Sequence, residues 1–157
     1  MLFCNQCEQA THVTACVTSP GVCGKSGDVQ SWQDLLLNGL RGLAAFAQQA
    51  RRLDRRHPEA GDFIQESLYA TGAGVNLEER DLYRRCLECG KICHEVLEML
   101  RGGHDERFGR PGPATAPGGT AHGPGILVTG SDLRDLAVLL ERVASTDLKV
   151  YTHGEML

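Results

Sequence analysis

Apolar residues recur every three or four positions through the middle of the chain, which is the spacing of an amphipathic helix. A first long helix is predicted from Ser31, where Ser31 and Asp34 provide a start signal, to Pro58, which stops it. A shorter helix is predicted from about Asp62 to Ala70, where glycines follow. The apolar face of the first helix comprises Leu36, Leu40, Leu43, Phe46, Ala47, Ala50 and Leu53.

A third helix is predicted from the pair Asn76 and Glu79, which resembles a capping pair, to about Arg101. Together the three helices can make a small antiparallel bundle. The inner face of the third helix comprises Leu82, Cys86, Cys89, Cys93, Val96 and Leu100.

Residues 102–124 interrupt this periodicity. They are rich in Gly, Pro, His and Thr, and their prolines break any regular element, which is typical of a linker. We therefore expect one domain at residues 1–101, a linker at 102–124, and a second domain from residue 125 to 157.

The last segment has the pattern of a strand, a helix and a second strand. Apolar runs at Ile126–Thr129 and Lys149–Tyr151 flank a leucine-rich helical pattern at Leu133–Val143. This is a partial Rossmann-like unit, in which ligands bind beyond the carboxyl ends of the strands. Two strands and one helix cannot bury both faces of a sheet, so we expect the start of a truncated α/β domain and a mixed α and α/β fold class.

The first 27 residues have no sustained hydrophobic period, which predicts a loop wrapped around something other than an apolar core, for which a metal is a candidate. Two residues separate Cys4 from Cys7, a spacing at which two thiolates can bind one metal centre, and Cys16 and Cys23 bring the ligands to four. Nearby glycines permit a tight backbone whose amides approach cluster sulfurs, and Lys25 adds positive charge near an anionic centre. The spacing favours an iron–sulfur cluster, while a structural zinc site and unligated thiols remain alternatives.

Two other groups could in principle carry chemistry. Cys86, Cys89 and Cys93 lie on one helical face beside His94, but that face is the expected core, and cysteine packs there as a small hydrophobe. We therefore interpret these cysteines as packing residues. At the tail, residues 152–155 (THGE) follow a predicted strand, so they could meet a ligand or metal, or be solvated end residues.

Composition narrows the classes of partner. The 157 residues carry a net charge of -4 and seven cysteines. This charge gives no reason to expect nucleic acid or an anionic membrane as a partner. Without a leader-like or membrane-spanning run, and with many cysteines, we expect a cytoplasmic protein with metal or redox chemistry.

Five segments resemble the hybrid cluster protein family, also called prismane protein or hydroxylamine reductase, in the same order along the chain. A single helical bundle between the first three and the last two resembles the N-terminal portion of the shorter members. The segments are FCNQCEQ at 3–9, GVCGK at 21–25, QDLL at 33–36, ILVTGSDL at 126–133 and VYTHGEML at 150–157.

The resemblance implies that the four N-terminal cysteines bind an electron-transfer cluster, a 4Fe-4S cubane in most shorter members. Electrons would come from a redox partner protein and pass to a hybrid iron–sulfur–oxygen cluster, which reduces hydroxylamine, a small nitrogenous substrate, to ammonia and water. Glu155 matches a carboxylate ligand of that hybrid cluster, and a hard oxygen donor suits an iron with an exchangeable position.

The chain differs from the family at three points. Ser131 stands where the family has a histidine ligand, and the chain ends at Leu157, before the other ligands of the hybrid cluster. We therefore expect no hydroxylamine reductase activity from this chain alone. Six residues between Cys16 and Cys23, where cubane-bearing members usually have five, make a 2Fe-2S cluster an alternative. A stand-alone electron carrier or docking module and a structural zinc protein are the alternative functions.

Overall fold

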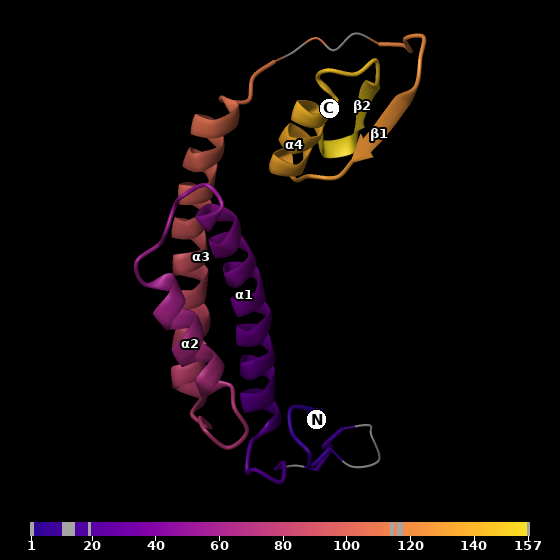
Figure 1. The fold of residues 1–157 in the computed structure, drawn as a ribbon. Coiled ribbons are helices and arrows are strands. Elements are labelled where there is room, and N and C mark those ends of the chain that lie inside the picture. Colours follow the sequence, from indigo (N-terminus) through magenta and orange to yellow (C-terminus); the bar gives the residue numbers. More distant parts are fainter. Residues whose placement is uncertain (1, 11–14, 19, 114, 116–117, 157) are drawn as a thin grey trace. The chain divides into compact units, whose positions relative to one another are not determined.

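The computed structural model describes residues 2–10, 15–18, 20–113, 115 and 118–156 (Figure 1). The chain divides into two compact units, Met1–Gly109 and Arg110–Leu157. Helices and a two-stranded sheet are both present, which confirms the mixed fold class. None of the helices in the described residues combines the length and the apolar character needed to cross a membrane.

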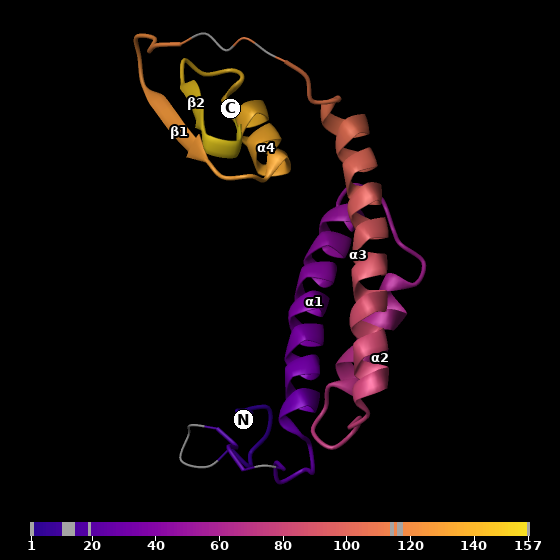
Figure 2. The same ribbon diagram turned by 180° about the vertical axis from the view of Figure 1, so that it is seen from behind.

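The first unit contains three packed helices, α1 (Gly27–Arg51), α2 (Ala60–Ala70) and α3 (Glu79–Phe108). The chain runs along α1, returns along α2 and reverses again into α3, so α1 and α3 run parallel, side by side (Figures 1 and 2). Polar contacts mark both ends of this pairing. Ser26 Oγ donates to Glu79 at the start of the two helices, and Arg55 pairs with Glu106 near their ends.

Apolar side chains from all three helices form one core. This burial supplies most of the stability of such helices, whose own propensity is marginal in water. At its edge, Trp32 of α1 meets Tyr83 of α3 edge to face, with 5.3 Å between ring centroids. The buried members of the core are Val29, Leu36, Leu40, Leu43, Ala60, Leu82, Cys89, Ile92 and Val96.

Helix α1 begins at Gly27, earlier than the predicted start at Ser31. Ser26 is the N-cap, and its side chain accepts a hydrogen bond of 3.1 Å from the amide of Val29. This contact satisfies one of the free amides of the first turn. The Ser31 hydroxyl lies inside the helix and donates to the carbonyl of Gly27 at 2.9 Å.

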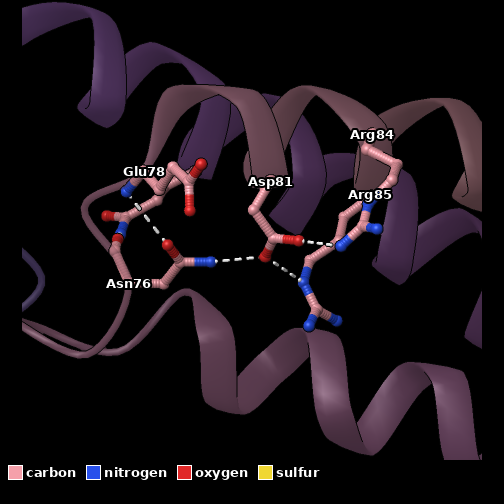
Figure 3. A network of polar contacts seen from close by, with 6 residues as sticks. Asn76, Glu78, Asp81, Arg84 and Arg85 are labelled. Atoms are coloured by element: carbon pink, nitrogen blue, oxygen red, sulfur yellow. Dashed lines mark hydrogen bonds and ion pairs between the residues drawn. The ribbon is translucent and has the colours of Figure 1, made fainter.

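Helix α3 begins with a small polar network (Figure 3). Glu78 is its N-cap, and the side chain of Asn76 accepts from the Glu78 amide at 3.0 Å while donating to Asp81 at 2.7 Å. Arg85 and Arg84 donate to the same carboxylate. Asn76 therefore organises the start of α3 from outside the helix.

Helix α3 continues to Phe108, so residues 102–108 of the expected linker are helical. Gly103 permits this, because a Cβ atom there would lie 3.1 Å from Leu53 Cδ1. The absence of a side chain lets α3 pack closely on the segment that follows α1.

The second unit contains β1 (Gly125–Thr129), α4 (Leu133–Val143), β2 (Lys149–His153) and a short 3-10 turn, η2 (Gly154–Met156). The strands pair in parallel, with Ile126 opposite Val150. This confirms the predicted strand, helix and strand. No residue of these elements is fully buried among those described, and a Rossmann-like sheet stays a prediction.

Candidate metal centre

Cys4 and Cys16 are paired by the backbone. The Cys4 amide donates to the Cys16 carbonyl at 3.1 Å, and the Cys16 amide donates to the Cys4 carbonyl at 2.6 Å, which makes an antiparallel bridge. Residues opposite each other in such a pair project their side chains from the same face. Two cysteines separated by eleven residues in the sequence thus share one surface of the loop.

All four N-terminal cysteines line one small pocket of the first unit. A tight turn brings the last cysteine to this pocket, because the Gly24 amide donates to the Gly21 carbonyl at 2.8 Å. Gly24 has a φ of 86°, which favours glycine. The pocket is lined by Leu2, Cys4, Cys7, Gln9, Cys16, Gly21, Val22, Cys23, Lys25 and Ala73.

The loop stabilises a thiolate at Cys16. The pKa of Cys16 is lowered, first by a hydrogen bond from the Thr18 hydroxyl, 3.5 Å away, and then by the backbone amide of Val22. Amide and hydroxyl donors of this kind stabilise the anionic sulfur that binds a metal.

Lys25 places a buried positive charge beside the pocket. Its side chain is 1% exposed, and its Nζ lies 3.7 Å from Cys4 Sγ. The same nitrogen donates to glutamine carbonyl oxygens at 3.0, 3.0 and 2.5 Å, which belong to Gln6, Gln30 and Gln33. These partners are neutral, and no carboxylate in the described part of the chain pairs with Lys25.

Two of the three glutamines make a second hydrogen bond through their amide nitrogen. Gln30 donates through Nε2 to Asp34 at 2.7 Å, and Gln33 donates through Nε2 to the carbonyl of Asn76 at 3.1 Å. Gln33 therefore connects the lysine to the network at the start of α3 in Figure 3. Gln6 differs, because its Nε2 is buried and has no hydrogen-bond partner among the described residues.

These residues fit an anionic metal cluster. A buried ammonium is costly unless an anion compensates it, and a cluster bound by four thiolates supplies negative charge at this position. The unpartnered Gln6 Nε2, inside the Cys4–Cys7 segment, is a donor for a sulfur acceptor. The side chains are not arranged as a finished ligand sphere, since the described residues contain no group of three or more His, Cys, Asp or Glu that could hold an ion.

The helical cysteines behave as core residues. Cys89 is buried between α1 and α3, and burial raises its pKa to about 11. Cys86 donates through Sγ to the Trp32 carbonyl at 3.7 Å, and Cys93 packs against the same core. A thiol that resists deprotonation is a poor metal ligand, so these contacts support the packing interpretation.

Glu155 belongs to the second unit. It lies exposed in η2, directly after β2, at the carboxyl ends of the two parallel strands. Met156 of the same turn packs near Gly130 at the end of β1, since a Cβ there would lie 3.8 Å from Met156 Cε. Ser131 follows Gly130, so Glu155 and Ser131 belong to the same edge of the sheet.

The glutamines around Lys25 are the functional candidates that the sequence pattern did not reveal. Gln30 and Gln33 are buried, although glutamine is usually exposed. A signal was available, because Gln33 lies three positions before Leu36 on the apolar face of α1. A polar residue at such a position indicates a buried polar partner.

The first unit carries a pocket lined by four thiols next to three packed helices. The second unit contains a parallel strand, helix and strand. The protein therefore combines a thiol-lined site with an α/β segment. The sequence pattern of the Prismane/CO dehydrogenase family matches residues 2–68 and 58–157. The chain belongs to this family. The resemblance seen in the sequence to the N-terminal portion of a hybrid cluster protein is therefore confirmed.

Curated relatives named hydroxylamine reductase align along nearly the whole chain. Identity is 45% with the protein of Moorella thermoacetica, 40% with that of Thermotoga maritima and 35% with that of Methanothermobacter thermautotrophicus, each over 156 residues. Each alignment covers 99% of this chain and 36% of the relative. The chain thus spans about a third of the length of these relatives.

Proposed function

We propose that Cys4, Cys7, Cys16 and Cys23 bind an iron–sulfur cluster and that the first unit relays electrons within a hydroxylamine reductase. The observation that carries this proposal is the buried ammonium of Lys25, 3.7 Å from Cys4 Sγ on a pocket lined by all four thiols. Family membership supports the same assignment. A bound cluster accepts and releases one electron at a time, at a potential that hydrogen bonds and solvent exposure set.

Different residues of the loop have different roles in binding the cluster. The Cys4–Cys16 bridge fixes two thiols on one face, while the turn at Gly24 brings Cys23 to the same pocket. Hydrogen bonds from the Thr18 hydroxyl and the Val22 amide lower the pKa of Cys16 and so favour its thiolate. Leu2 is fully buried at the pocket and excludes water from that side.

We propose a 4Fe-4S cluster as the cofactor. A 2Fe-2S cluster is the alternative, because the Cys16–Cys23 gap is longer than in most cubane-bearing members. In the assembled enzyme a redox partner protein supplies the electrons, and hydroxylamine is reduced to ammonia and water. We propose Glu155 as a ligand of the hybrid cluster, since it lies exposed at the sheet edge where α/β ligands bind. All seven cysteines are free, which accords with a cytoplasmic location.

The metal content of anaerobically purified protein tests this proposal. We expect about four irons and four sulfides per chain for a cubane, or about two of each for the smaller cluster, with a matching electron paramagnetic resonance spectrum. Zinc without iron would overturn the redox function and support a structural zinc site.

Two matched variants test the ligands. Cys7→Ser is expected to lose most of the bound iron, because it removes one of four thiolates. Cys93→Ser is the control, since Cys93 is similarly half-buried but packs against the helical core. Equal loss of iron from both variants would contradict the assignment.

A further inference from the structure

Lys25 carries a positive charge whose position is fixed by three glutamines, and this arrangement points to a role beyond cluster binding. We propose that Lys25 is the counter-charge that favours the reduced form of the cluster, and that Gln6, Gln30 and Gln33 are the positioning residues that hold it. This inference rests on the proposed function, because it requires a cluster at the four cysteines.

The geometry leaves the ammonium little freedom. A lysine ammonium has three N–H donors, and three amide oxygens within 3.0 Å accept them. Cys4 Sγ, at 3.7 Å, is therefore a neighbour of the charge and not its main acceptor. Asp34 and Asn76 bind two of the glutamines in turn, and these bonds restrict the position of the charge beside the pocket.

The neutrality of the three acceptors matters for the reduction equilibrium. Reduction adds one electron to the cluster, and no bond forms or breaks at Lys25. A positive charge that is not cancelled by a carboxylate interacts more favourably with the more negative, reduced cluster. Glutamines satisfy the hydrogen bonds of the ammonium and leave its full charge available to the pocket.

Gln6→Glu tests this proposal with little structural change. The new carboxylate keeps the shape of the side chain and the hydrogen bond to Lys25 and cancels most of the lysine charge. The Nε2 atom that it replaces has no protein partner among the described residues, but it is the donor assigned above to a cluster sulfur, so the effect of losing that donor is measured separately with Gln6→Met. Lys25→Met is less informative, because it leaves three amide oxygens without a donor, two of them on the buried Gln30 and Gln33.

The reduction potential is measured by titration with dithionite and ferricyanide through mediators, followed by visible absorbance. We expect the Gln6→Glu variant to bind the same iron per chain and to have a one-electron reduction constant at least about tenfold lower, a shift of about 59 mV. Gln6→Met removes the amide without adding a charge, and we expect less than half of this shift. Gln9→Glu adds a carboxylate at an exposed position on the same pocket, where water screens it, and we again expect less than half.

Each outcome separates this inference from the proposed function. An unchanged potential in Gln6→Glu with full iron content overturns the role of Lys25 and leaves cluster binding intact. Equal shifts in Gln6→Glu and Gln9→Glu also overturn it, because the effect would then be independent of Lys25. Loss of iron from Gln6→Glu counts against it as well, since all four thiols remain, whereas absence of iron from the unmodified protein overturns the proposed function itself.

Discussion

Asp81 is a partly buried carboxylate whose negative charge contributes to the stability of the fold. Arg85 first, and then Arg84 and Asn76, lower the pKa of Asp81 to about 2 from its ordinary 3.8 (Figure 3). A carboxyl whose folded pKa is below its unfolded value stabilises the fold above the unfolded value. That stability is lost as the pH falls from 3.8 toward about 2.

Asp81→Asn should therefore destabilise the fold in a pH-dependent way. We expect a loss of about 2 kcal/mol at pH 7 that shrinks below pH 4 and vanishes near pH 2, as measured by urea unfolding of the metal-free chain. Asp62→Asn is the control, because Asp62 has no ion-pair partner among the described residues. A loss that stays constant with pH would show that shape and not charge is responsible.

At the scale of elements, the sequence predicted which helices and strands form but not where every helix ends. The sequence predicts that α3 ends near Arg101, because a segment rich in Gly, Pro, His and Thr begins at residue 102. In the folded unit Gly103 is buried against Leu53, and this long-range contact outweighs the low helix propensity of glycine. Local pattern cannot contain such a contact.

The candidate site, like the helix ends, was only partly predictable from local sequence pattern. Spacing predicted the four cysteines as metal ligands, and the sequence puts the positively charged Lys25 two residues after the last of them. It could not reveal that Lys25 is buried or that Gln6, from a different segment, completes its shell, because these facts depend on how the loop packs on α1.

Close packing of α1 on α3 gives a prediction at this scale. A Cβ on Gly39 would lie 3.0 Å from Cys89 Sγ, whereas a Cβ on Gly90 would meet nothing within 4 Å. Gly90→Ala should stabilise the protein by about 1 kcal/mol, from helix propensity alone. Gly39→Ala should fall short of that gain, because the methyl group crowds Cys89.

A double-mutant cycle tests the crowding. Combining Gly39→Ala with Cys89→Ala should relieve the contact, so we expect a coupling free energy of about 1 kcal/mol in thermal or urea unfolding. Simple additivity of the two substitutions would show that α1 and α3 adjust without strain.

For the whole molecule, the two units differ in how much they bury. The first unit has a continuous apolar core, whereas none of the described residues of β1, α4 or β2 is fully buried. Regions with few buried contacts open more readily and exchange amide hydrogens faster. The stability of the second unit therefore depends more than that of the first on contacts from outside the unit.

Hydrogen exchange followed by mass spectrometry measures this difference. We expect amides of residues 125–153 to exchange at least about tenfold faster than those of α1 and α3, since local opening there costs less free energy. Comparable protection in both units would contradict the inference that the sheet is weakly stabilised.

Trp32 gives the molecule a built-in optical reporter. It is the only tryptophan in the sequence, it stacks edge to face on Tyr83, and its neighbour Gln33 holds Lys25. Its emission therefore comes from the end of the bundle next to the thiol pocket. Because an iron–sulfur chromophore absorbs near the emission of indole, quenching of this single fluorophore can follow the filling of the site in real time without any label.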